Sequence, residues 1–166
     1  MKKKRLALLA LPAVFTLAFA MPAHALGDDG EPDGTDVELS SQTMSPEIQT
    51  VISYARAQLG KPYVAGAAGP KAFDCSGLTM MAYRQIGIDM PHLSFTQARL
   101  GWAVSRDDIR AGDLLFFFGG QAPARNLGHV TVAVSATHMI SAPRPGLRVH
   151  LVPIPGSVQA VRRYVP

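Results

Sequence analysis

The chain has 166 residues, of which 48% are hydrophobic and 17% charged, and it contains one cysteine. A single cysteine excludes an internal disulfide framework, and this length suits one domain with one hydrophobic core. Four of the 16 basic residues fall within the first five positions, which leaves 12 basic against 12 acidic residues in the rest. No basic segment is interleaved with aromatic residues, so the sequence does not support nucleic-acid binding.

The first 25 residues have the pattern of a secretory signal peptide. Lys2-Lys3-Lys4-Arg5 precedes an apolar run over residues 6–21, and Ala23-His24-Ala25 fits the small-x-small rule for cleavage. The apolar run is shorter than the roughly 20 residues that a membrane-spanning helix needs, so we expect no stable membrane span. This pattern predicts a secreted protein, located in the cell wall or the periplasm after cleavage.

Residues 26–44 are acidic, polar and rich in Gly and Pro, which predicts a disordered leader. The remaining segment, residues 45–166, is predicted to form one domain. Its first helix begins at Ser45, a suitable N-cap that is followed by Pro46, and ends at Gly60. The next helix runs from Cys75 to about residue 86, and a short helix covers residues 94–100.

The apolar period changes in the second half of the domain. Short runs of β-branched, aromatic and small residues are separated by Gly, Pro and Ser, which predicts strands. These strands cover residues 114–118, 129–134, 139–142, 147–152 and 158–164. Helices followed by strands predict an α+β fold with a mainly antiparallel sheet.

Cys75 is the first candidate for chemistry. It follows a polar turn and precedes a helical run, so we expect its thiol on the first turn of a helix, where the thiolate is favoured. A catalytic thiol also needs a base that the fold brings to it. Four histidines remain beyond the signal peptide, and His129 is the best candidate because it begins a strand directly after Gly128. The sequence contains no His-x-x-x-His or Cys-x-x-Cys spacing, so we expect no metal and no cofactor.

Several motifs then resemble one family. Phe73-Asp74-Cys75-Ser76-Gly77-Leu78, the segment at 111–117 and Gly128-His129-Val130 resemble the NlpC/P60 family of cell-wall cysteine peptidases. The resemblance covers about residues 45–166, and it includes further matches at 61–64, 90–92, 97 and 139–143.

The resemblance implies a papain-like α+β core in which the Cys75 helix packs on the sheet, so that residues 45–166 form a catalytic domain. It also implies a peptidoglycan hydrolase that cleaves stem peptides, commonly between D-γ-glutamate and the diamino acid. Cys75 would be the nucleophile and His129 the base. Tyr63, Asp74 and Ser76 match positions that bind substrate, although helix capping explains Asp74 equally well. The expected partners are peptidoglycan stem peptides in a bacterial cell wall, and we expect a monomer.

The third catalytic residue of the family lies 12 residues beyond the base, which here is Ser141. A serine hydroxyl orients a histidine ring less firmly than a charged group does. His138 is an alternative. If residues 129 and 141 pair across a hairpin, however, 138 opposes 132 and points to the other face of the sheet. We therefore expect His138 at an exposed turn.

Other interpretations remain open. The same Cys-His dyad could serve a cell-wall amidase, and Ser141 favours a catalytically weak or inactive peptidoglycan-binding domain. Cys75 could also be a redox thiol. His92 is interpreted as lining the substrate groove or as structural, and His150 has no evident partner.

Overall fold

A computed structural model describes residues 44–118 and 127–166. The predicted signal peptide lies outside the described residues, and so does the predicted acidic leader except for Met44. The predictions for these segments therefore remain predictions.

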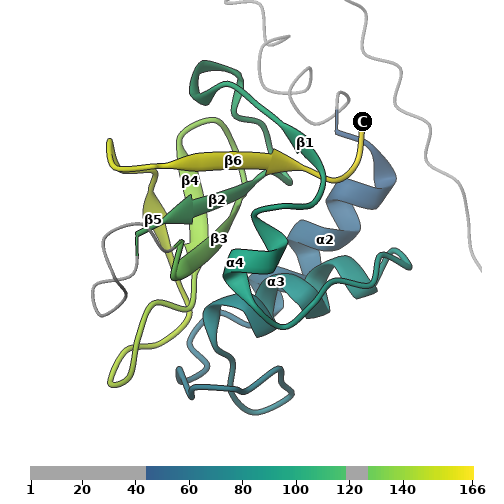
Figure 1. Cartoon of the computed structure of the whole chain (residues 1–166). Coiled ribbons are helices and arrows are strands. Elements are labelled where there is room, and N and C mark those ends of the chain that lie inside the picture. The colour runs from purple at the N-terminus through teal and green to yellow at the C-terminus, as the bar shows by residue number, and fades with distance from the viewer. Residues whose placement is uncertain (1–43, 119–126) are drawn as a thin grey trace, which may run out of the picture. The chain divides into compact units, whose positions relative to one another are not determined.

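Three helices precede most of the strands. Helix α2 spans Pro46–Ala57, α3 spans Cys75–Arg84 and α4 spans Ser94–Gln97 (Figure 1). Ser45 caps α2 as expected, since its hydroxyl accepts a hydrogen bond from the backbone N–H of Ile48 at 3.4 Å. Both predicted long helices are confirmed, and each ends two or three residues earlier than expected because its last turn continues as a hydrogen-bonded turn rather than as helix.

The described strands form one six-stranded sheet in the order β1-β6-β2-β3-β4-β5, in which every pairing is antiparallel. The strands are β1 Trp102–Ala103, β2 Leu114–Phe117, β3 His129–Ala133, β4 His138–Ser141, β5 His150–Pro153 and β6 Ala160–Arg163. The α+β prediction with an antiparallel sheet is thereby confirmed. The sequence missed β1 and the 3-10 turn at Arg106–Asp108 because neither contains enough apolar residues to show a period.

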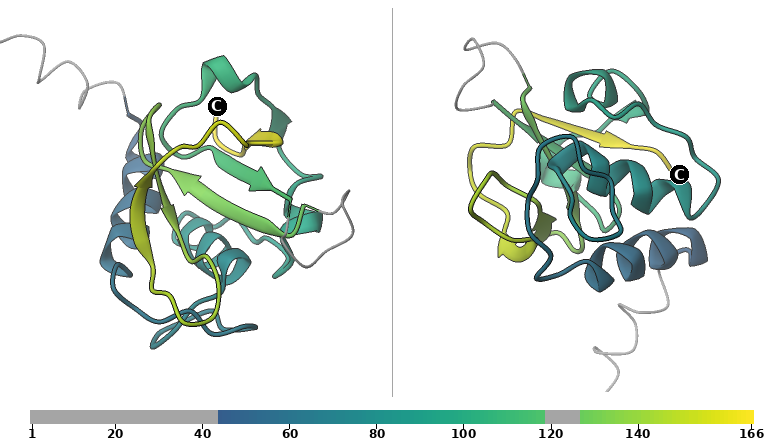
Figure 2. Two further views of the ribbon diagram at one scale, coloured as in Figure 1. Left: turned by 90° about the vertical axis from the view of Figure 1, so that its left-hand side faces the viewer. Right: turned by 90° about the horizontal axis from the view of Figure 1, so that it is seen from below.

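Helices α2 and α3 lie side by side against one face of the sheet, as two views at right angles show (Figure 2). The core between them includes fully buried side chains of α3 and β3 such as Tyr83 and Val130. A second, smaller apolar cluster covers the opposite face and includes Leu115 and Phe117. Strand β2 is therefore buried on both faces, which explains its unbroken apolar sequence.

Strand β6 is anchored to the turn before β2 by an ion pair. Arg163 Nε donates to Asp113 Oδ1 at 2.8 Å, and Arg163 Nη2 donates to Asp113 Oδ2 at 2.8 Å. Because the Asp113 side chain is only 1% exposed, it depends on these partners for its solvation. The pair helps to hold the C-terminal strand β6 in its place between β1 and β2.

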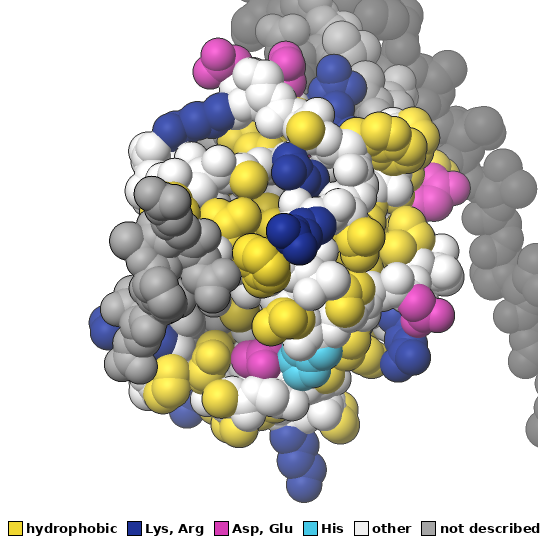
Figure 3. All heavy atoms as spheres, in the orientation of Figure 1, with side chains coloured by type: hydrophobic (Ala, Val, Ile, Leu, Met, Phe, Trp, Pro, Cys, Tyr) yellow, Lys and Arg dark blue, Asp and Glu magenta, His cyan; other side chains and the backbone are white. Residues whose placement is uncertain are grey.

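Hydrophobic side chains interrupted by Lys and Arg gather over α4 and β1 on the face seen in Figure 3. Trp102 is 59% exposed there, and the guanidinium of Arg99 lies 4.6 Å from the centre of the Phe95 ring. This stacking partly shields the Phe95 ring from water.

Candidate active site

Cys75 is the first residue of α3, and Asp74 is its N-cap. The Asp74 carboxylate accepts a hydrogen bond from the backbone N–H of Gly77 at 2.6 Å, which fixes the start of the helix. The thiol is 9% exposed and lies at the backbone N–H of Val130, at the beginning of β3. The fold thus brings the first turn of α3 to the residue that follows His129.

The thiol does not have the electrostatic character that its helix position suggests. Burial raises the pKa of Cys75 and outweighs the backbone N–H of Val130, which lowers this pKa, while the negative charge of Asp74 raises it further. The expectation that the helix N-terminus favours a resting thiolate is therefore wrong. The helix end is covered by protein. The loss of hydration therefore destabilises the thiolate more than the backbone N–H groups stabilise it.

His129 is the first residue of β3, and its side chain is bonded to Ser141 at the end of β4. His129 Nε2 lies 3.1 Å from Ser141 Oγ, as expected for a base and its third residue. The ring also lies 5.9 Å from the ring of Phe117, its partner across the β2–β3 ladder. Because Nε2 faces Ser141, Nδ1 is the nitrogen left for the thiol.

The register of β3 and β4 differs by two residues from the one assumed in the sequence analysis. Val132 pairs with Ile140 and Ala133 with Met139, which places residue 131, not 129, opposite Ser141. The shift is even, so His129 and Ser141 still share a face of the sheet. His138 is exposed, as predicted, and its Nδ1 lies 3.0 Å from Thr137 Oγ1, but it is the first residue of β4 and not part of the turn.

The electrostatic environment keeps His129 neutral. Burial, followed by the nearby charge of His150, lowers the pKa of His129 to about 4. With the pKa of Cys75 raised, the two groups rest at neutral pH as a thiol and a neutral imidazole. Because no thiolate is present in the resting site, the thiol proton of Cys75 must pass to His129 while the sulfur attacks the substrate.

Asp74 does more than cap the helix. Its carboxylate also accepts from the backbone N–H of Gly66 at 2.8 Å and lies 2.8 Å from His92 Nε2. The hydroxyl of Ser76 donates to the same carboxylate at 3.2 Å. These bonds tie the loop before α3, the loop after it and the helix start to one buried carboxylate.

Tyr63 is half-buried in the loop between α2 and α3. Burial raises the pKa of its hydroxyl, and the negative charges that Cys75 and Asp74 carry when ionised raise it further. The backbone of Tyr63 pairs with that of Phe73, two residues before Cys75. Its backbone N–H donates to the carbonyl of Leu147 at 3.0 Å. The loop that carries Tyr63 thus lies beside the segment that leads into α3, where Asp74 and Ser76 flank Cys75 in the chain.

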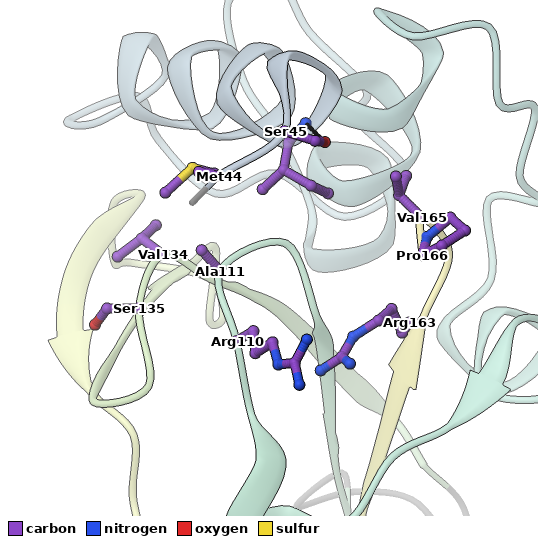
Figure 4. A pocket seen from close by; sticks show the side chains of 10 residues that line it. Met44, Ser45, Arg110, Ala111, Val134, Ser135, Arg163, Val165 and Pro166 are labelled. Carbon is purple, nitrogen blue, oxygen red and sulfur yellow. Dashed lines mark hydrogen bonds between the residues drawn. The ribbon is translucent and has the colours of Figure 1, made fainter. Parts of the chain in front are cut away.

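A cavity of about 650 Å³ lies elsewhere in the domain, between the start of α2 and the C-terminus (Figure 4). The side chains of Arg110 and Arg163 extend into the same space there. None of the residues that line this cavity belongs to the Cys75–His129–Ser141 group. We assign the candidate site to that group because it contains the reactive side chains, whereas the cavity does not.

In the part of the chain that the structure describes, no helix is long and apolar enough to cross a membrane. Over the same residues, no group of three or more His, Cys, Asp or Glu side chains is arranged to hold a metal ion.

Comparison with known proteins identifies the domain. The sequence profile of the NlpC/P60 family matches residues 60–162. The chain belongs to the NlpC/P60 family. The family resemblance that the sequence motifs indicated is thus confirmed, and the observed fold agrees with the fold that this resemblance implies. An NlpC/P60 family protein from Bacillus cereus is similar in structure, with a TM-score of 0.67 and 33% identity, over 74% of this chain and 42% of that one.

Two curated relatives of this NlpC/P60 chain have informative names. A gamma-D-glutamyl-L-lysine dipeptidyl-peptidase of Bacillus cereus is 32% identical over 139 residues, which cover 81% of this chain and 41% of the relative. The peptidoglycan endopeptidase RipA of Mycobacterium tuberculosis is 33% identical over 130 residues, which cover 69% of this chain and 26% of the relative. The chain spans about half or less of the length of the first curated relatives it matches.

Sequence reasoning missed three features of this NlpC/P60 site. It gave His92 no specific partner, yet His92 pairs with Asp74. It found no partner for His150, which lies directly opposite Ser141 in the β4–β5 ladder. It also passed over Gly77, where a Cβ atom would clash with the carbonyl oxygen of Ala67 and lie 2.9 Å from His92 Nε2. Of these three features, only Gly77 could have been noticed in the sequence. Glycine inside a helix costs about 1 kcal/mol relative to alanine, so its presence there suggests a close contact that excludes a side chain.

Proposed function

We propose that this chain is a secreted cysteine endopeptidase that cleaves peptidoglycan stem peptides at the bond between D-γ-glutamate and the diamino acid. The observation that carries the proposal is the line from Cys75 on α3 to His129 on β3 and Ser141 on β4, closed by the 3.1 Å contact between His129 and Ser141. The names of the peptidoglycan endopeptidase and the gamma-D-glutamyl peptidase among its relatives support the substrate class. Secretion rests on the signal-peptide pattern of residues 1–25.

The proposed reaction begins with proton transfer from Cys75 Sγ to His129 Nδ1 as the sulfur attacks the carbonyl carbon. The resulting oxyanion would be stabilised by free backbone N–H groups of the first turn of α3, aided by the Tyr63 hydroxyl. Collapse of this intermediate breaks the C–N bond, and His129 gives the proton to the leaving amine. Water, deprotonated by His129, then hydrolyses the acyl-thioenzyme and restores the thiol.

The three proposed substrate residues have different tasks. Tyr63, whose loop pairs with the segment that leads to Cys75, would contact the substrate directly. The Asp74 carboxylate already accepts hydrogen bonds from Gly66, Ser76 and Gly77, so it would mainly hold the walls of the site in place. Ser76 is only 6% exposed and bonded to Asp74, which makes a supporting part more suitable for it than a direct contact.

The test is mass spectrometry of purified muropeptides after incubation with residues 26–166, beside Cys75→Ala as the inactive control. We expect the wild type alone to cut the D-γ-glutamyl bond. Cleavage at the bond between muramic acid and the stem would favour an amidase that uses the same dyad. No cleavage by a folded wild type with a reduced thiol would favour the binding-domain alternative, which the weak third residue Ser141 makes worth testing.

A further inference from the structure

Ser141 leaves the tautomer of His129 undecided. A serine hydroxyl can accept a hydrogen bond from His129 Nε2–H, or it can donate one to a bare Nε2. In the second case the ring proton sits on Nδ1, and this nitrogen, the one not bonded to Ser141, cannot accept the thiol proton. A carboxylate at this position could only accept and would enforce the productive tautomer. With serine, another group must turn the hydroxyl proton away from His129.

His150 lies where such a group is needed. It is the first residue of β5 and pairs directly with Ser141, the last residue of β4. Directly opposed residues have Cβ atoms about 4.5–5.5 Å apart and share a face of the sheet. Because the β3–β4 register puts His129 on that same face, the three side chains lie on one face of three neighbouring strands, with His129 two residues from the position directly opposite Ser141.

The hydrogen bond of His150 fixes its own tautomer. Its Nδ1 lies 2.8 Å from the backbone carbonyl of Arg148, and a carbonyl can only accept, so Nδ1 carries the proton. Nε2 of the neutral ring is therefore an acceptor. Arg148 is itself held in place, since its Nη1 donates to the carbonyl of Gly60 at 2.8 Å. The acceptor on His150 is thus presented by a firmly connected segment.

We propose that His150 is a positioning residue for the base: it draws the Ser141 hydroxyl proton toward β5, so that Ser141 accepts from His129 Nε2–H and Nδ1 stays free for Cys75. Among the described contacts the two side chains share no direct hydrogen bond. Such a link requires one bridging water molecule or a small rotation of the His150 ring.

This inference rests on the proposed function, and a double-mutant cycle in the protein comprising residues 26–166 tests it. The cycle compares the wild type, His150→Leu, Ser141→Ala and the double variant. His150→Gln is the conservative variant, because its amide can donate to the Arg148 carbonyl and still offer an oxygen to Ser141. His138→Leu is the matched control, since His138 is an exposed histidine of the same sheet that does not touch the site.

Two readouts are taken for each protein: kcat and KM on a stem peptide, and the rate at which iodoacetamide alkylates Cys75. We expect His150→Leu to lower kcat roughly three- to tenfold with little change in KM, and to have no further effect in the Ser141→Ala background. His150→Gln should retain most of the wild-type kcat, and His138→Leu all of it. Melting temperatures of all variants show whether each one is folded.

Multiplicative losses in the double variant would overturn the inference, and so would equal losses in His150→Leu and His150→Gln. An equal loss in His138→Leu would also overturn it, because the effect would then be general to the sheet. Alkylation separates this inference from the proposed function. Suppose that the wild type cuts no stem peptide, so that the peptidase proposal fails. The role of His150 would still be upheld if His150→Leu changes the alkylation rate of Cys75 when Ser141 is present and leaves this rate unchanged in the Ser141→Ala background.

Discussion

The resting state of the Cys75–His129 pair is the main question at the scale of single residues. Burial pushes the two pKa values in opposite directions, up for the thiol and down for the imidazole. Both shifts disfavour the charged form, so the free protein holds a neutral pair. Substrate binding or the transition state must then draw the proton across.

The pH dependence of alkylation tests this neutral pair. Because Cys75 is the only cysteine of the chain, iodoacetamide labels one thiol. We expect the labelling rate to be still rising at pH 9, where an ordinary thiol, with a pKa of about 8.5, is mostly ionised. The urea-unfolded protein serves as the control with an ordinary thiol. A plateau already reached near pH 6 would show a stored thiolate and contradict the prediction.

Ser141 carries a second prediction at this scale. Ser141→Ala removes the hydroxyl that orients His129, so we expect kcat to fall roughly three- to tenfold and KM to change little. Steady-state kinetics on a stem peptide give the two constants separately. Thr137→Ala, which removes an exposed hydroxyl of the β3–β4 turn, is the control. An unchanged kcat in Ser141→Ala would mean that the dyad works alone.

At the scale of elements, the site depends on how closely the start of α3 meets its two neighbouring loops. Asp74 connects these three segments, and Gln97 of α4 adds to them: its side-chain amide donates to the carbonyls of Ser76 at 3.1 Å and Pro91 at 2.9 Å. Gln97 is fully buried, so water does not compete for these hydrogen bonds. The short helix α4 thus braces the helix that carries the nucleophile.

Gly77→Ala tests the close approach at the start of α3. Alanine favours the helix, but its Cβ would clash with Ala67 and crowd His92, and we expect a net loss of about 1–3 kcal/mol in the free energy of unfolding. Urea denaturation measures this loss. Gly156→Ala is the control, because the nearest atom to its Cβ is 3.7 Å away on the flexible side chain of Arg106. Equal stability of the two variants would show that the loop yields without cost.

At the scale of the whole molecule, the buried histidine links stability to pH. The pKa of His129 is about 4 in the fold, against 6.5 for an ordinary histidine, so the unfolded chain binds the proton first. The contribution of the neutral His129 to stability is therefore fully present above pH 6.5 and is lost as the pH falls toward 4. The loss from this group is about 3 kcal/mol.

Urea denaturation at pH 7 and pH 4.5 measures this linkage in the wild type and in His129→Gln. We expect the wild type to lose more stability than His129→Gln between the two pH values, since glutamine does not titrate. His138→Gln, which alters an exposed histidine, should behave like the wild type. Parallel pH profiles of wild type and His129→Gln would contradict the buried, neutral histidine.

Much of the domain could be predicted from local sequence. The Ser45-Pro46 helix start, the Cys75 helix and the five longer strands follow from capping residues and apolar period, which act within a few neighbours. The motifs around Cys75, at residues 111–117 and around His129 indicated the family, which also fixes the fold. Strand β1 was missed because a two-residue strand has no period and exists only through its pairing with β6.

What the sequence by itself determined is which side chains are the candidates for the chemistry and on which elements they lie. The tertiary structure alone decided their electrostatic state and their partners. Burial reversed the expected pKa shift of Cys75, the β3–β4 register came out two residues away from the assumed one, and His150 was placed opposite Ser141. These outcomes depend on solvent exclusion and on pairing between distant strands. Solvent exclusion and strand pairing are set by the packed fold, and they cannot be inferred from the residues that neighbour each of these positions in the chain.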